Sequence, residues 1–88
     1  MSESGNQEVT LYALSTCGWC KMARGWLDEN HVEYKCIYVD HLTKEERDAL
    51  VADIEKRIGR RPAFPTVFCG DKYVVGFNKD QLKEILGL

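Results

Sequence analysis

The sequence has no apolar run that approaches the roughly 20 residues that a membrane-spanning helix needs. It also has no excess of positive charge, because 12 Lys and Arg stand against 14 Asp and Glu for a formal net charge of −2. A nearly balanced chain lacks the basic surface that binds nucleic acid or an anionic membrane. We therefore expect no nucleic-acid partner and no membrane partner.

The first residues have neither the basic start nor the apolar stretch of a secretory signal. We expect residues 1–7 to form a flexible polar tail and residues 8–88 to form one small domain. Without an export signal the expected location is the cytoplasm, where permanent disulfides are rare.

The four cysteines therefore need another explanation than structural disulfides. Cys36 and Cys69 stand alone in strand-like segments, where a cysteine usually packs as a small hydrophobe. Cys17 and Cys20 are separated by only two residues, a spacing typical of redox exchange or of metal binding.

Hydrophobic periodicity and turn residues predict an α/β domain with the order β-α-β-α-β-β-α. The expected strands are residues 9–14, 33–39, 66–69 and 72–75, and the expected helices are residues 17–30, 44–58 and a last one from residue 79. The first two strands flank a helix, so they should be parallel with a right-handed crossover. The last two form a hairpin, which predicts a mixed four-stranded sheet flanked by helices. The first helix should bury one face, made of Met22, Ala23, Trp26 and Leu27.

Cys17 stands where the first strand hands over to this helix. Free backbone N–H groups and the positive end of the helix dipole favour a thiolate there, and Lys21 and Arg24 add positive charge. Cys20 follows one turn later, deeper in the helix. We predict that Cys17 is the nucleophile that attacks a substrate disulfide and that Cys20 resolves the mixed disulfide.

Two other interpretations of this cysteine pair remain open. A structural zinc site would need two more ligands at matching spacing, and His31 and His41 offer only an isolated pair of loop residues. Inert buried thiols are the other interpretation. Gly18, which interrupts the regular pattern between strand and helix, argues against that one.

Taken together, four features resemble the glutaredoxin family within the thioredoxin fold. They are the strand that leads into Cys17-Gly-Trp-Cys20, the segment from Gly59 to Phe68, the Gly70–Asp71 hairpin, and Gly76 before a capped last helix. They extend over residues 9–87. The resemblance implies a thioredoxin-like fold and a thiol–disulfide oxidoreductase.

The resemblance also implies a substrate-binding surface around the cysteines. It implies a cis Phe64–Pro65 peptide bond and a Phe64 backbone that pairs with an extended substrate segment. We expect Trp19 to be exposed and to contact partners, because Trp is enriched at binding hot spots. The full set of expected substrate-binding residues is Gly18, Trp19, Phe64, Pro65, Gly76 and Phe77.

Two departures from glutathione-using members point to a subclass. Leu14 stands where those members usually carry a lysine, and Val75–Asp80 lacks their Gly-Gly-x-Asp-Asp motif. The Gly76–Phe77 pair is closer to the NrdH-redoxin branch. That branch is recharged by a thioredoxin-reductase-type enzyme, and ribonucleotide reductase is among its clients.

The leading hypothesis is a monomeric dithiol carrier that reduces protein disulfides and binds no cofactor besides its own Cys17–Cys20 pair. Three alternatives stay open: a glutathione-dependent glutaredoxin, a glutaredoxin that binds an iron–sulfur cluster through Cys17, and an interaction module without redox activity. A Cys17→Ser variant that keeps full function would indicate the last of these.

Overall fold

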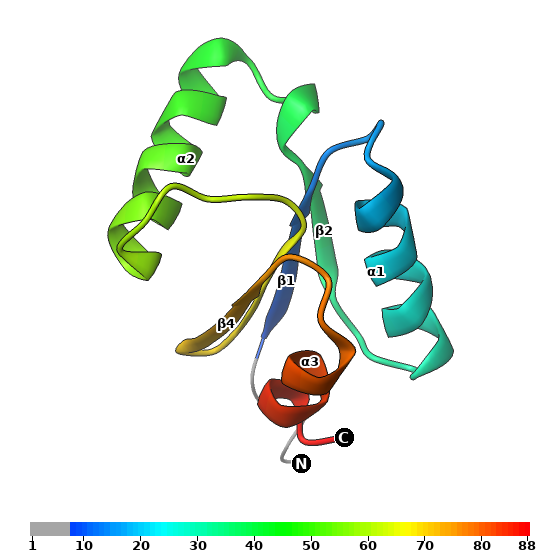
Figure 1. Cartoon of the computed structure of the whole chain (residues 1–88). Helices are drawn as coiled ribbons and strands as arrows, with labels where there is room; N and C mark the ends of the chain where they lie inside the picture. Colours follow the sequence, from blue (N-terminus) through cyan, green and yellow to red (C-terminus); the bar gives the residue numbers. More distant parts are fainter. Residues whose placement is uncertain (1–7) are drawn as a thin grey trace.

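A mixed β-sheet forms the centre of the computed structural model, which describes residues 8–88 (Figure 1). The expected tail at residues 1–7 lies outside the described residues. The strands are β1 (Val9–Ala13), β2 (Lys35–Tyr38), β3 (Thr66–Cys69) and β4 (Lys72–Val75), in the order β2-β1-β3-β4. β1 is parallel to β2 and antiparallel to β3, and β3 is antiparallel to β4. The predicted thioredoxin-like sheet is therefore confirmed.

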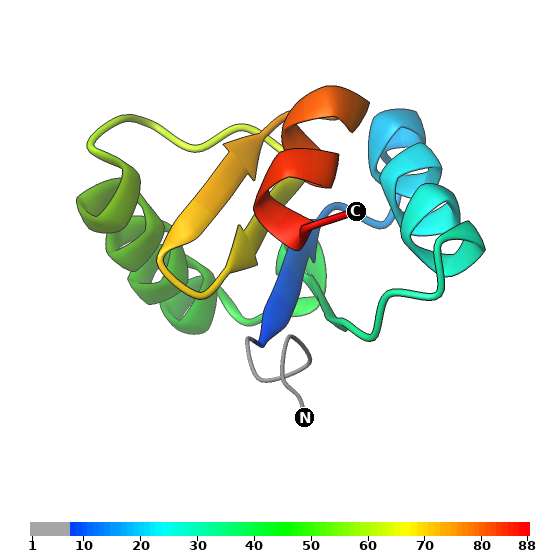
Figure 2. The same cartoon turned by 90° about the horizontal axis from the view of Figure 1, so that it is seen from below.

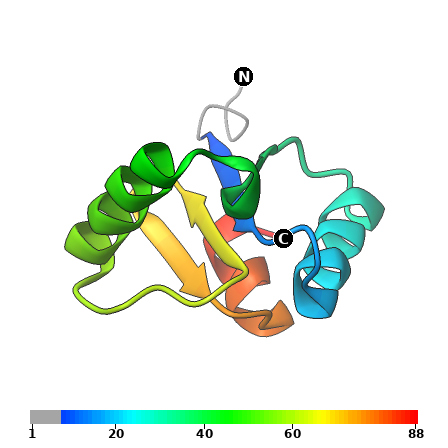
Figure 3. The ribbon, with the colours of Figure 1, turned by 90° about the horizontal axis from the view of Figure 1, so that it is seen from above.

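Helices cover both faces of this sheet. They are α1 (Gly18–Glu29), the short 3₁₀ helix η2 (Val39–His41), α2 (Lys44–Ile58) and α3 (Lys79–Leu86). Figures 2 and 3 show α1 and α3 on one face and α2 on the other. Two hydrophobic clusters match this arrangement, since Leu27 and Leu82 pack with Leu11 and Val67, whereas α2 packs Ile54 onto the opposite face.

The central strand β1 connects the two clusters. Successive side chains of a strand point to opposite faces, so Leu11 belongs to the α1/α3 side and Tyr12 to the α2 side. All five residues of β1 are buried, as expected for a strand that is covered on both faces. This buried strand ends at Ala13, immediately before residues 14–20, which we call the cysteine turn.

Capping residues define the ends of α2 and the start of α3. Thr43 and Glu46 form a reciprocal capping box at the start of α2, and Gly59 ends that helix with a positive φ of 73°. Asn78 caps α3 by accepting a hydrogen bond from the Gln81 backbone at 3.1 Å. Among residues 8–88, none of the helices has the length and apolar character that crossing a bilayer requires.

One prediction about the core is wrong. Met22 is 52% exposed, and Cys20 takes its place among the buried residues of α1. The buried stripe contains Cys20, Ala23 and Leu27, spaced three and four residues apart, and Met22 lies about 100° around the helix from Ala23. The sequence pattern also missed η2 (Val39–His41), whose first residue was predicted as the end of the second strand.

Candidate active site

Cys17 is the N-cap residue of α1. Its backbone is extended (φ −92°, ψ 120°), and its Sγ accepts a hydrogen bond from the Cys20 backbone N–H at 3.2 Å. The Cys17 N–H in turn donates to the Leu14 carbonyl at 3.2 Å. N-cap residues are usually Ser, Thr or Asp, whose side-chain oxygen accepts a hydrogen bond from the first turn. Here the acceptor is a sulfur, so the first-turn N–H groups point at Cys17 Sγ.

Cys20 lies one helical turn further and is 2% exposed. Its Sγ accepts a hydrogen bond from the Leu14 N–H at 3.4 Å, which connects the buried sulfur to the end of β1. Burial, followed by the interaction with Cys17, raises the pKa of the Cys20 thiol to about 12. Cys20 is therefore held as a neutral thiol.

The electrostatics of Cys17 are opposite. A hydrogen bond from the Cys20 side chain is the largest effect and lowers the pKa of Cys17 below its ordinary value of 9.0. Burial opposes this effect, and the backbone N–H groups of Cys20 and Trp19 add to it. The two cysteines thus differ: Cys17 is partly accessible to solvent and has a lowered pKa, whereas Cys20 is buried and has a raised pKa.

Lys21 and Arg24, the nearby cations expected to favour a Cys17 thiolate, are not among the causes of its lowered pKa. Arg24 donates a hydrogen bond to the Tyr38 hydroxyl on β2, and its guanidinium lies 5.9 Å from the centre of the Tyr38 ring. Arg24 is therefore engaged at the sheet edge, and the lowered pKa of Cys17 comes from Cys20 and the helix start.

Asp40 supports the cysteine turn and was missed by the sequence analysis. Its carboxylate accepts hydrogen bonds from the Ser15 N–H at 2.9 Å and from the Ser15 hydroxyl. These bonds lower the pKa of Asp40. The available signal was topological: Ser15 follows β1 and Asp40 follows the parallel strand β2, and the carboxyl ends of parallel strands meet at one edge of a sheet.

Five of the six predicted substrate-binding residues come together beside this turn. Trp19, Phe64, Pro65, Gly76 and Phe77 line a hollow of about 280 Å³, and Trp19 is 62% exposed. The Phe64–Pro65 peptide bond is cis, as the resemblance implies, and the Gly76 N–H donates to the Pro65 carbonyl at 2.7 Å. Gly18, the sixth residue, starts α1 outside the lining of this hollow.

The remaining cysteines lie in the sheet. Cys36 is half-buried in β2, and Cys69 is buried at the end of β3, where burial raises the pKa of its thiol. Within residues 8–88, no three or more His, Cys, Asp and Glu side chains are grouped to hold a metal ion. The arrangement of the cysteines therefore lends no support to the zinc interpretation.

Comparison with known proteins gives consistent matches. The family model described as Glutaredoxin matches residues 9–74. Among curated proteins, glutaredoxin 1 of Rickettsia typhi is 31% identical over 85 residues, covering 92% of this chain and 78% of that protein.

Solved structures agree with the sequence matches. A glutaredoxin from Archaeoglobus fulgidus superposes with a TM-score of 0.83 at 36% identity, over 93% of this chain and 88% of that chain. Methanoredoxin from Methanosarcina acetivorans gives a TM-score of 0.82 at 33% identity, over 92% of this chain and 85% of that one. The matched region contains both the cysteine turn and the Phe64–Pro65 loop.

Proposed function

The chain belongs to the glutaredoxin family of thiol–disulfide oxidoreductases, and we propose that it reduces protein disulfides with Cys17 as nucleophile and Cys20 as resolving thiol. The observation that carries this proposal is the opposite shift of the two sulfurs, since the pKa of Cys17 is lowered and that of Cys20 is raised to about 12. Only the thiolate attacks disulfides, so the reaction begins at Cys17.

In the first step the Cys17 thiolate attacks one sulfur of the substrate disulfide. A Cys17–substrate S–S bond forms, the substrate S–S bond breaks, and the electron pair leaves on the second substrate sulfur. Cys17 then has no negative charge, which removes two of the effects that raise the pKa of Cys20. Formation of the mixed disulfide thereby prepares Cys20 for the second step.

In the second step Cys20 loses its proton to solvent and attacks Cys17 Sγ. The Cys17–Cys20 bond forms, and the first substrate sulfur leaves as a thiolate. Two electrons have passed to the substrate, and the oxidised Cys17–Cys20 pair needs a reductase or thiol to recharge it. The dithiol itself is the redox group in this proposal, in a monomer that works in the cytoplasm.

Trapping of the intermediate tests these roles. A Cys20→Ser variant should accumulate a mixed disulfide with a protein substrate, because nothing resolves the Cys17–substrate bond. A Cys17→Ser variant should trap nothing. The proposal fails if Cys17→Ser still forms a mixed disulfide and Cys20→Ser does not.

Two parts of the sequence support a proposal for the reductant. Leu14, which is half-buried beside the cysteines, stands where glutathione-using members usually carry a lysine. The segment Val75–Asp80 lacks their Gly-Gly-x-Asp-Asp motif. We propose a thioredoxin-reductase-type enzyme as the reductant and protein disulfides, such as that of ribonucleotide reductase, as clients. Oxidised protein is offered to NADPH with thioredoxin reductase and, separately, to glutathione with glutathione reductase. Faster turnover with glutathione would favour the glutathione-dependent alternative.

A further inference from the structure

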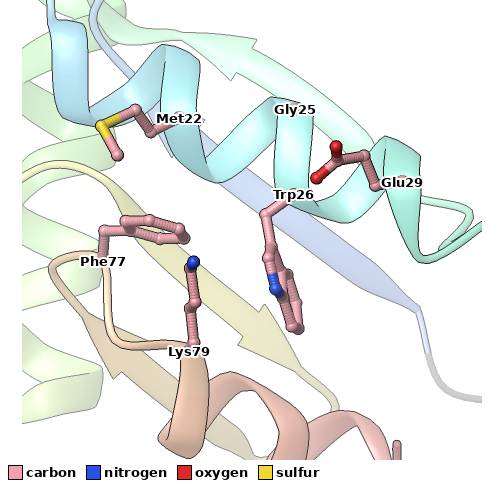
Figure 4. Close-up of a pocket in the computed structure, with 6 residues that line it drawn as sticks. All are labelled: Met22, Gly25, Trp26, Glu29, Phe77 and Lys79. Atoms are coloured by element: carbon pink, nitrogen blue, oxygen red, sulfur yellow. The ribbon is translucent and has the colours of Figure 1, made fainter.

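A second hollow lies along α1, beyond the one at the cysteines. Its volume is about 310 Å³, and it is lined by Met22, Gly25, Trp26, Glu29, Phe77 and Lys79 (Figure 4). Figure 4 shows Met22 and Phe77 near one end, with Trp26 and Glu29 further along the helix. The Lys79 side chain extends from the start of α3 toward α1.

The chemistry of this hollow suits an apolar side chain. An aromatic ring, an indole and a thioether form much of its lining, whereas Glu29 and Lys79 contribute charges of opposite sign. Met22 is 52% exposed, although methionine side chains are usually buried in the core. An exposed apolar surface with a polar rim is typical of an interaction site.

The two hollows are neighbours, because Phe77 lines both. The first hollow contains Trp19 of the cysteine turn and the Phe64–Pro65 loop. Any protein disulfide that Cys17 attacks brings its own chain to this place. The substrate chain must then leave the cysteines in some direction, and the second hollow is a largely apolar surface on the other side of Phe77 along α1.

We propose that the second hollow binds an apolar side chain of the protein substrate, three or four residues away from the substrate cysteine that bonds to Cys17. The inference rests on the proposed function, since it describes how the same substrate extends from the redox site. The specificity element in the substrate is then a large aliphatic or aromatic residue at a fixed distance from its cysteine.

The spacing follows from helix and strand geometry. The residues of α1 in the second hollow are centred between eight and nine residues after Cys17, which is about 13 Å along a helix that rises about 1.5 Å per residue. An extended peptide advances about 3.3 Å per residue, so it covers this length in three to four residues. Glutathione, a tripeptide without a large apolar side chain, has neither the reach nor the group to fill the hollow.

The test uses single turnovers of the reduced wild-type chain with synthetic peptides. Each peptide has one cysteine disulfide-bonded to thiopyridine, one leucine at a distance of one to six residues on either side, and glycine and serine elsewhere. Attack of Cys17 on the peptide sulfur breaks the S–S bond and releases thiopyridone, whose absorbance gives the rate. Cys20 then displaces the peptide thiol, so no external reductant is needed.

We expect the rate to be highest when leucine is three or four residues from cysteine, about tenfold above a peptide with serine in its place. Met22→Glu should reduce this preference to less than about twofold, because it introduces a carboxylate into the lining of the hollow. Leu88→Glu is the matched control, because it adds the same charge at a residue that is 56% exposed and lines neither hollow. It should keep the full preference.

The outcomes separate this inference from the proposed function. Equal rates for all peptides, or equal effects of Met22→Glu and Leu88→Glu on the preference, overturn the inference while the reductase activity stands. If the wild-type chain releases no thiopyridone from any peptide, the proposed function itself fails. A preference at one or two residues contradicts the assignment of the second hollow and indicates binding in the first.

Discussion

Cys17 Sγ accepts a hydrogen bond from the Cys20 backbone N–H at 3.2 Å, so the residue proposed to resolve the reaction also activates the nucleophile. The side chain of Cys20 makes a second hydrogen bond to Cys17 and is the largest reason for the lowered pKa of Cys17. Because the Cys20 thiol keeps its proton, it can donate for as long as Cys17 is a thiolate. The pair therefore titrates as a coupled unit.

The first prediction concerns the reactivity of Cys17 as a function of pH. Its alkylation by iodoacetamide in the reduced protein should reach half of its maximal rate below pH 9.0, because the thiolate is stabilised. Cys20→Ala removes the donated side-chain hydrogen bond and should move this midpoint upward. Mass spectrometry of peptides containing Cys17 measures the rate, and a wild-type midpoint at or above 9.0 would contradict the assignment.

The second prediction concerns stability at alkaline pH. The thiol of Cys20 has a pKa of about 12 when folded and of 9.0 ordinarily. The unfolded chain therefore releases this proton more readily, so the stability that Cys20 contributes is complete below pH 9.0 and is lost between 9.0 and about 12. Urea unfolding of the reduced protein should show a decline in this interval.

The comparison with Cys20→Ala isolates this contribution, since lysines and tyrosines titrate in both proteins. The variant should lose less free energy of unfolding than the wild type over the same pH interval. Cys17 behaves with the opposite sign: its lowered pKa stabilises the fold above 9.0 and the effect is lost as the pH falls through the folded value. Parallel pH dependences of wild type and Cys20→Ala would refute the raised pKa of Cys20.

The third prediction concerns Asp40. Asp40→Ala removes the acceptor that holds both the N–H and the hydroxyl of Ser15, two residues before Cys17. We expect disulfide reduction to slow a few-fold because the cysteine turn becomes less ordered. Ser15→Ala should give part of this loss and should also raise the pKa of Asp40, which nuclear magnetic resonance can follow.

A double-mutant cycle makes the Asp40 prediction specific. If Asp40 acts through Ser15, the double variant should be little slower than Asp40→Ala alone. Asp53→Ala, a change of the same type on the exposed side of α2, is the control and should leave the rate unchanged. Additive losses from Ser15→Ala and Asp40→Ala would indicate two independent effects.

The elements of the fold were predictable because their signals are local. The capping box of Thr43 and Glu46, the stop at Gly59 and the Gly70–Asp71 turn each encode a helix or strand end within a few residues. The position of Cys17 at the start of α1 was predictable for the same reason. The parallel crossover and the hairpin then predicted a mixed four-stranded sheet, but the pairing of β3 with β1 joins distant segments and was not predicted.

The features that sequence analysis missed depend on contacts between distant segments. Asp40 and Ser15 are 25 residues apart and meet only because β1 and β2 are parallel neighbours. Met22 fits an apolar helical face, but in the fold it lines the second hollow together with Phe77 and with Lys79 at the start of α3. Periodicity along one helix contains no information on which other element lies beside it.

The last prediction contrasts two glycines. A Cβ added at Gly25 or at Gly59 would meet no atom within 4 Å, so neither substitution by alanine causes a clash. Gly25 lies inside α1 with ordinary helical geometry, where Gly→Ala stabilises a helix by roughly 0.5–1 kcal/mol through the lower entropy of the unfolded chain. Gly59 has a φ of 73°, a left-handed conformation that costs alanine about 1 kcal/mol.

Urea unfolding should therefore show opposite shifts, with Gly25→Ala more stable and Gly59→Ala less stable than the wild type. Shifts of the same sign would mean that the backbone conformation at one of these two positions differs from the one described.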